Sequence, residues 1–223
     1  MSYILCIIHC IRDRPVCLFN IFIEITMNNN KETIIHEAQK LFSLNGYLNT
    51  GINEIIDAAG TSKGGFYNHF ASKEELFHVV LEASQKIWRE KVLTSISETK
   101  KPIQKIIQIL HNYRDNYLID SENFPGGCIF ITFSVELDDT HPHLIKEVYK
   151  GFEGFKGILI NLLEEAKNLG DIPAHADSRK ITDCIFTGML GASVLYGVNK
   201  SFDTLDRSIS ALIEYLLLIC KNT

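Results

Sequence analysis

The sequence has few prolines, little alternation of apolar and polar residues and no long uninterrupted apolar run. It contains 5 prolines in 223 residues, and strands of a half-buried sheet would need that alternation, so we expect helices throughout. The apolar runs 4–11 and 16–25 are broken by charged or amide residues and fall short of the ~20 residues that span a bilayer. The start also lacks the basic segment and cleavage site of a signal peptide. We predict an all-α protein without a membrane partner.

Cysteine pairs, metal-ligand groupings and enzyme motifs are also missing. Cys6, Cys10 and Cys17 lie near the start and the other three cysteines are widely spaced, so a reduced, cytoplasmic compartment is expected. The stretch 138–143 holds two aspartates and two histidines, but caps and solvated groups before a helix explain them without a metal. We find no nucleophile elbow and no phosphate-binding glycine loop. We therefore expect no enzyme activity, no metal and no cofactor.

An excess of basic residues is missing too. The net charge is −5, and residues 31–76 hold 4 Lys against 6 Asp or Glu, so no generally basic domain indicates nucleic acid. The distribution of charge is more informative, because residues 58–72 contain no acid while Lys63 lies within them and Lys73 follows them.

Residues 50–76 form the most informative segment of the chain. Branched and small apolar residues at 52–59 predict a short helix, and Gly60 allows a sharp turn after it. Thr61 or Ser62 is expected to cap a second helix up to Asn68. A third helix is expected to open with a capping box in which Ser72 and Glu75 satisfy each other's backbone amides. This layout is that of a helix-turn-helix DNA reader.

The second helix of this segment carries groups suited to DNA. Lys63 and Lys73 can neutralise phosphates, the Tyr67 hydroxyl can bond one, and the Asn68 amide suits a base edge. The pair Gly64-Gly65 costs about 1 kcal/mol per residue relative to alanine in a helix. We infer that close approach of the backbone to DNA favours these glycines.

A set of residues between 31 and 76 lies at a fixed spacing without a gap: Ile34, Ala38, Leu41, Phe42, Gly46, Tyr47, Thr50, Ile55, Ala59, Gly60, Ser62, Lys63, Gly64, Phe66, Tyr67, His69, Phe70, Ser72, Lys73 and Glu74. In this set, residues 31–76 resemble the N-terminal domain of the TetR/AcrR family of bacterial transcriptional regulators. Ile56 departs from the pattern, because the family usually has a small alanine there, and this affects the expected angle between the two helices.

The resemblance implies an N-terminal three-helix helix-turn-helix domain followed by a larger helical ligand-binding and dimerisation domain. We place the first at 27–76, with its reader unit at about 51–70, and the second at 77–223. Repression from a palindromic operator, released by a small-molecule effector, is the mode that the resemblance implies. The expected DNA-binding residues are Thr50, Ser62, Lys63, Gly64, Gly65, Tyr67, Asn68, His69 and Lys73.

Residues 1–26 do not fit either domain. We interpret them as an apolar or disordered extension that is not native, with translation beginning at Met27 before the polar residues 28–30. A membrane-adhering appendage is the alternative interpretation.

The larger domain is expected to contain helices at 73–94, 102–119, 126–137, 142–169, 176–199 and 204–221. We expect an effector to enter its core and tilt the first of these helices. The expected pocket residues are Tyr113, Tyr117, Cys128, Phe133, Phe152, Phe155 and Phe186. A homodimer formed by the last two helices is implied by the resemblance, with an interface at Gly188, Ala192, Leu195, Ile209, Leu212, Ile213 and Leu216.

Two other functions remain open at this point. Cys128 lies at a predicted helix start, where the helix dipole lowers the pKa of a thiol, so a regulator that responds to electrophiles or oxidants is possible. An inert buried thiol is the simpler interpretation. A helical scaffold that binds another protein through its apolar last helix, without DNA binding, is the second alternative.

Overall fold

The computed structural model describes residues 15–99, 101–137 and 140–221, and every regular element within these ranges is a helix. This confirms the predicted all-α class. The elements are α2 (Pro15–Asn45), α3 (Ile52–Ala58), α4 (Lys63–Tyr67), α5 (Lys73–Val92), α6 (Pro102–Asn112), the π-helical turn η1 (Tyr113–Tyr117), α7 (Ile129–Glu136), α8 (Pro142–Asn168), α9 (Ser178–Asn199) and α10 (Phe202–Lys221).

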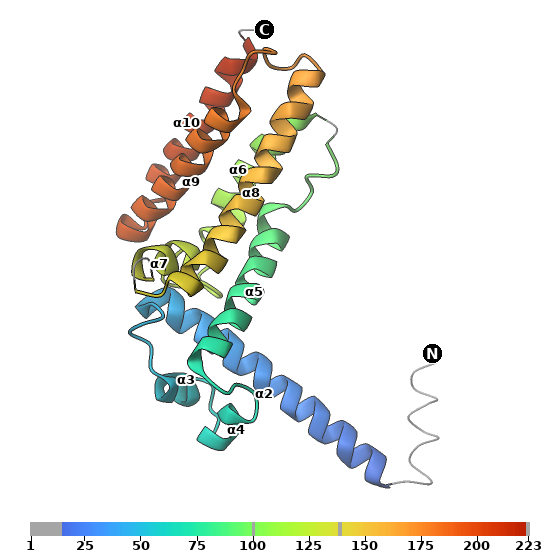
Figure 1. Ribbon diagram of the computed structural model, residues 1–223, viewed down its shortest axis with the longest axis vertical. Helices are drawn as coiled ribbons and strands as arrows, with labels where there is room; N and C mark the ends of the chain where they lie inside the picture. The colour runs from blue at the N-terminus through green and yellow to red at the C-terminus, as the bar shows by residue number, and fades with distance from the viewer. Residues whose placement is uncertain (1–14, 100, 138–139, 222–223) are drawn as a thin grey trace.

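The molecule is elongated, with α3 and α4 near one end and the far ends of α9 and α10 at the other (Figure 1). Helix α5 leaves the N-terminal unit and runs into the larger domain, where α8, α9 and α10 lie side by side. Helix α7 lies where the two parts meet, against both α2 and α8. The predicted order of a small reader domain and a larger helical domain is confirmed.

The N-terminal unit is held together by apolar side chains from each of its helices. Ile34 and Phe42 of α2, Ile55 of α3 and Phe66 of α4 are all fully buried. Gly60 has φ +62° in the turn between α3 and α4, a backbone conformation that favours glycine. The short α4 is therefore stabilised by tertiary packing, since a helix of this length is unstable alone.

Two serines cap the helices on either side of this unit's second turn. The Ser62 Oγ accepts a hydrogen bond from the Gly65 amide at 3.0 Å, and the Ser72 Oγ accepts one from the Glu75 amide at 3.0 Å. The prediction that the Glu75 carboxylate accepts a hydrogen bond from the Ser72 amide was wrong. The Glu75 carboxylate accepts from the Ala71 amide instead, at 2.7 Å, one residue farther out from the helix.

The expected helix 102–119 changes its winding half-way. The Leu118 amide donates to the Tyr113 carbonyl at 3.0 Å, which widens the last turn into η1. Tyr113 and Tyr117 are both buried and stack with ring centroids 5.7 Å apart. Such π turns often occur at functional sites, and this one faces the core of the larger domain.

Helix α9 is, within the described ranges, the one helix long and apolar enough to cross a membrane. It packs on α8 and α10, and the Asp177 carboxylate caps its start by accepting from two backbone amides at 3.1 and 3.2 Å. Since 33% of its apolar window is buried in the single chain, we interpret α9 as a packed helix of the larger domain that also leaves apolar residues exposed.

The predicted domain boundary at Met27 lies inside α2, which continues from Pro15 to Asn45. Residues 1–14 are outside the described part of the chain. The interpretation of residues 1–26 as an added segment therefore stays a prediction.

Candidate DNA-binding surface and ligand cavity

Helix α4 presents a polar surface that no acidic side chain interrupts. Ser62, Lys63, Tyr67 and Asn68 are exposed, while Phe66 on the opposite side is fully buried. The Lys63 charge, the Tyr67 hydroxyl and the Asn68 amide therefore lie on the outside of the N-terminal unit. This combination can contact both the phosphates and the base edges of duplex DNA.

The two glycines of α4 have different surroundings. A Cβ atom at Gly64 would meet only Ser62 Oγ, at 3.9 Å, which is an ordinary contact, so the fold leaves room for it. A Cβ atom at Gly65 would lie 2.5 Å from Thr61 Oγ1. Internal packing thus accounts for Gly65, whereas the fold gives no reason for Gly64. Only Gly64 still calls for an external surface that approaches the backbone.

Three expected DNA-binding residues are less exposed than the polar residues of the α4 surface. Thr50 is fully buried, and its hydroxyl donates to the Gly46 carbonyl at 2.7 Å, so its side chain closes the turn after α2. His69 is half-buried beside Phe70. Lys73 is half-buried with its Nζ 4.4 Å from the Tyr47 ring centroid. Burial lowers the pKa of the Lys73 ammonium, and the Glu136 charge partly opposes this.

Helix α2 also supports the reader unit, which the sequence patterns did not indicate. The Asn30 amide donates to Thr61 Oγ1 at 3.2 Å, and the Lys31 ammonium lies 5.8 Å from the Phe70 ring centroid. In the sequence, the polar residues 28–30 are the one feature at this position, and their pattern does not predict a contact with Thr61.

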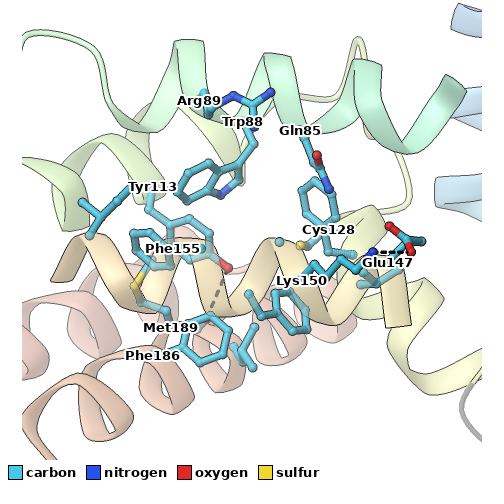
Figure 2. A pocket seen from close by; sticks show the side chains of 17 residues that line it. Gln85, Trp88, Arg89, Tyr113, Cys128, Glu147, Lys150, Phe155, Phe186 and Met189 are labelled. Atoms are coloured by element: carbon cyan, nitrogen blue, oxygen red, sulfur yellow. Dashed lines mark hydrogen bonds and ion pairs between the residues drawn. The ribbon is translucent and has the colours of Figure 1, made fainter. Parts of the chain in front are cut away.

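A cavity of about 470 Å³ lies in the larger domain between α5, η1, α7, α8 and α9 (Figure 2). Six aromatic rings contribute to its wall. The Trp88 and Phe155 ring centroids are 4.8 Å apart, and Phe186 lies 6.0 Å from Phe155. The lining residues are Gln85, Trp88, Arg89, Tyr113, Cys128, Phe130, Glu147, Val148, Lys150, Gly151, Phe152, Gly154, Phe155, Ile158, Phe186, Met189 and Leu190.

The structure brings five of the seven expected pocket residues to this cavity: Tyr113, Cys128, Phe152, Phe155 and Phe186. Tyr117 and Phe133 are not in its wall. Tyr117 stacks on Tyr113, with ring centroids 5.7 Å apart, and Phe133 packs with Phe77 at a centroid distance of 4.8 Å. The aromatic pattern could not separate these cases, because a core ring and a cavity ring have the same spacing on a helix.

The polar groups at the cavity were missed by sequence reasoning. Lys150 and Glu147 form an ion pair at 2.6 Å, and Gln85 and Arg89 lie along the α5 side of the cavity (Figure 2). The Tyr113 hydroxyl donates to the Met189 carbonyl at 3.4 Å, and burial raises the pKa of Tyr113 well above its usual value. The cavity is therefore lined by apolar and aromatic side chains, with charged side chains contributed by both α5 and α8.

Two family models match the chain, and together they include both domains. The model described as "Bacterial regulatory proteins, tetR family" matches residues 34–80, and "Tetracyclin repressor-like, C-terminal domain" matches residues 102–212. The chain belongs to the TetR family.

Relatives of this TetR-family chain align over most of its length. The HTH-type transcriptional repressor DhaR of Mycobacterium sp. (strain GP1) is 24% identical and covers 86% of this chain and 94% of its own. A TetR transcriptional regulator from Chloroflexus aurantiacus J-10-FL has a TM-score of 0.80 at 26% identity, over 86% of this chain and 96% of that one. AibR, solved in complex with isovaleryl coenzyme A and operator DNA, has a TM-score of 0.64 at 16% identity, over 82% and 96%.

Within this TetR-family fold, Cys128 is the N-cap of α7 and faces the cavity. Its Sγ lies 3.5 Å from the Tyr117 hydroxyl. The expected lowering of the thiol pKa was wrong. Removal from water raises the pKa of Cys128, and the hydrogen bonds from Tyr117 and from the first amides of α7 offset this only in part.

The residues expected at a dimer interface fall into two groups. Ala192, Ile209 and Leu216 are buried within the single chain, and a Cβ atom at Gly188 would lie 2.5 Å from Leu212 Cδ2. These residues pack α9 on α10 within the single chain, where Gly188 and Leu212 are half-buried. The assignment of the dimer interface stays a prediction. Ile213 is half-buried, whereas Leu195 is 50% exposed. Other large apolar side chains of α9 and α10 are also exposed, namely Val194, Val198, Phe202, Leu217 and Leu218.

Substitution of Gly64 by alanine tests the external role of that glycine. Because the fold leaves room for the new Cβ atom, Gly64→Ala should keep or raise the free energy of unfolding, by up to about 1 kcal/mol. Its affinity for operator DNA should fall, because the methyl group enters the contact surface. Urea unfolding and gel-shift titration measure the two effects. Gly157→Ala on α8, where a Cβ atom meets open space, should leave DNA affinity unchanged.

Alkylation with iodoacetamide tests the state of Cys128. Since a raised pKa means less thiolate at pH 7.5, Cys128 should react about tenfold or more slowly than the exposed Cys184. Peptide mass spectrometry over time measures both rates, and the urea-unfolded protein, in which the rates should converge, is the control. Faster reaction at Cys128 would show an activated thiol and restore the thiol-sensor alternative.

Proposed function

We propose that the protein is a dimeric, cytoplasmic transcriptional repressor that binds a palindromic operator and leaves it when a small molecule fills the cavity. The observation that carries the proposal is the exposed, acid-free surface of α4. A scaffold protein would have no need of this surface together with the room that the fold leaves at Gly64. Relatives named as repressors, and AibR with operator DNA, support it.

The roles of the α4 residues follow from their exposure. Lys63 and Tyr67 bind phosphates, and Ser62 and Asn68 approach base edges, with Gly64 allowing close contact. Thr50 acts indirectly by closing the turn after α2. Lys73, already close to Tyr47, adds positive charge at the edge of this surface.

The small-molecule effector is inferred from the walls of the cavity. Apolar and aromatic side chains suit a largely apolar molecule with ring character or an acyl chain, since such contacts provide most of the affinity in concave sites. Arg89 of α5 and Lys150 of α8, the latter paired with Glu147, offer contacts to a polar end of the ligand. Binding without chemical conversion accounts for these features, so the proposal includes no enzyme activity.

The homodimer is inferred from the exposed apolar residues of α9 and α10. Val194, Leu195 and Val198 recur on one face of α9, and Leu217 and Leu218 lie on α10. Exposed apolar residues that recur on one helix face, as they do near the end of α9, are typical of an interface. Two-fold symmetry would present two α4 helices to half-sites one DNA turn apart, ~34 Å.

Substitution of Lys63 tests DNA binding. In a dimer Lys63→Ala removes two phosphate contacts, so affinity for the DNA upstream of the coding sequence should fall about tenfold or more and the slope of log K against log salt should decrease by about 2. Gel-shift titrations at several salt concentrations measure this. Lys180→Ala, an exposed lysine near the start of α9, is the matched control. Equal binding by wild type and Lys63→Ala would contradict the proposal.

Substitution of Val198 tests the dimer. Val198 is 82% exposed in the single chain, so Val198→Glu should fold normally, but it would bury a charge in the interface and shift the protein to monomers. Sedimentation equilibrium measures the mass. Leu169→Glu, at another exposed apolar residue (62%), should remain dimeric. A dimeric Val198→Glu would place the interface elsewhere.

A further inference from the structure

Helix α7 is in contact with the cavity at its start. Cys128 and Phe130 line the cavity, and the loop just before them lies directly on α2. The Gly126 amide donates to Ser43 Oγ at 3.2 Å. A Cβ atom at Gly126 would lie 1.8 Å from the Ser43 carbonyl oxygen, so the backbone of α2 and this loop could not approach so closely with any other residue.

The other end of α7 binds the N-terminal unit through one carboxylate. Glu136 Oε2 accepts from the Tyr47 amide at 2.6 Å, and Oε1 accepts from the Leu48 amide at 2.8 Å. Gly46 has φ +83°, and a Cβ atom there would lie 2.5 Å from Glu136 Oε1. The turn after α2 is thus shaped around this carboxylate, with two amides directed at it and no side chain in its way.

The same turn is tied to the start of α5. The Lys73 Nζ lies 3.4 Å from the Leu48 carbonyl oxygen and 4.4 Å from the Tyr47 ring centroid. The Glu136 charge raises the pKa of Lys73 against the effect of burial. Glu136 therefore acts on both segments that flank the helix-turn-helix unit, the turn before α3 and the first residue of α5.

We propose that Glu136 is a positioning residue that couples the cavity to the DNA reader through α7. Occupation of the cavity displaces the start of α7, and its end carries the displacement to the Tyr47 and Leu48 amides. With eight residues, α7 is short enough to move as one rigid unit. This inference rests on the proposed function, because it names the route by which a ligand would alter DNA binding.

Hydrogen exchange of the Tyr47 and Leu48 amides tests the link without DNA or ligand. Glu136→Ala should speed exchange at these two amides about tenfold or more, as expected for loss of a charge-assisted hydrogen bond. Glu136→Gln should give a smaller increase, because its carboxamide retains one acceptor oxygen. Glu164→Gln on α8 is the control, and amides in α9 report whether the fold is intact. Unchanged exchange in Glu136→Ala would overturn the proposal.

A double-mutant cycle separates coupling from local support. Phe130→Leu alters the cavity wall on α7, and Phe186→Leu alters it on α9. Phe130→Leu should speed exchange at Tyr47 and Leu48 when Glu136 is present and should add nothing in Glu136→Ala. Phe186→Leu should leave both amides unchanged. Additive effects of Phe130→Leu and Glu136→Ala would mean that Glu136 merely supports the turn, and would overturn the coupling.

The hydrogen-exchange measurements can be interpreted whether or not the protein binds its upstream DNA. If wild-type protein fails to bind its upstream DNA, the proposed function fails, while the exchange data still decide whether α7 links the cavity to the N-terminal unit. If wild type binds DNA, Glu136→Ala should weaken binding several-fold while Glu164→Gln does not. Normal DNA affinity in Glu136→Ala would show that the carboxylate has no part in placing the reader.

Discussion

The aromatic contact between α2, α5 and α7 is the constraint on which the arrangement of the two domains depends. The Phe133 ring lies 4.8 Å from Phe77 and 6.1 Å from Phe42, and Tyr47 lies 5.1 Å from Phe77. All four rings are buried, and such pairs are stabilising beyond the area they bury. The reader unit and the larger domain therefore share one core, so α4 cannot reorient without disturbing helices that also line the cavity.

Charge and desolvation divide the molecule into regions with different tasks. The α4 surface keeps its cation and amide in water, where they are available to a polyanion. Burial raises the pKa of both Tyr113 and Cys128 at the cavity wall and keeps both groups neutral near pH 7. Apolar side chains that neither the core nor the cavity uses remain exposed near the end of α9 and on α10. Each region follows from which side chains the tertiary packing leaves exposed.

Local patterns predicted much of the fold because helix starts and ends are short-range events. Ser72 caps α5 as expected, and the helix expected at 142–169 corresponds to α8, Pro142–Asn168. Patterns failed where a role depends on a distant neighbour. Thr50 matches its family position, yet its hydroxyl is occupied inside the protein. Gly188 keeps α9 close to Leu212 of the same chain, and one sequence does not show whether a flat helix face meets its own chain or a partner.

The sequence by itself determined the family, the helical class and the acid-free reader segment, because these depend on residue types at fixed local spacing. Only the tertiary structure decided that the Glu136 carboxylate reaches the Tyr47 and Leu48 amides, nearly ninety residues away in the chain. It also decided which aromatic rings enclose a cavity and which fill the core. These features arise where separate helices converge, and the geometry of convergence is set by packing of the whole chain rather than by any one segment.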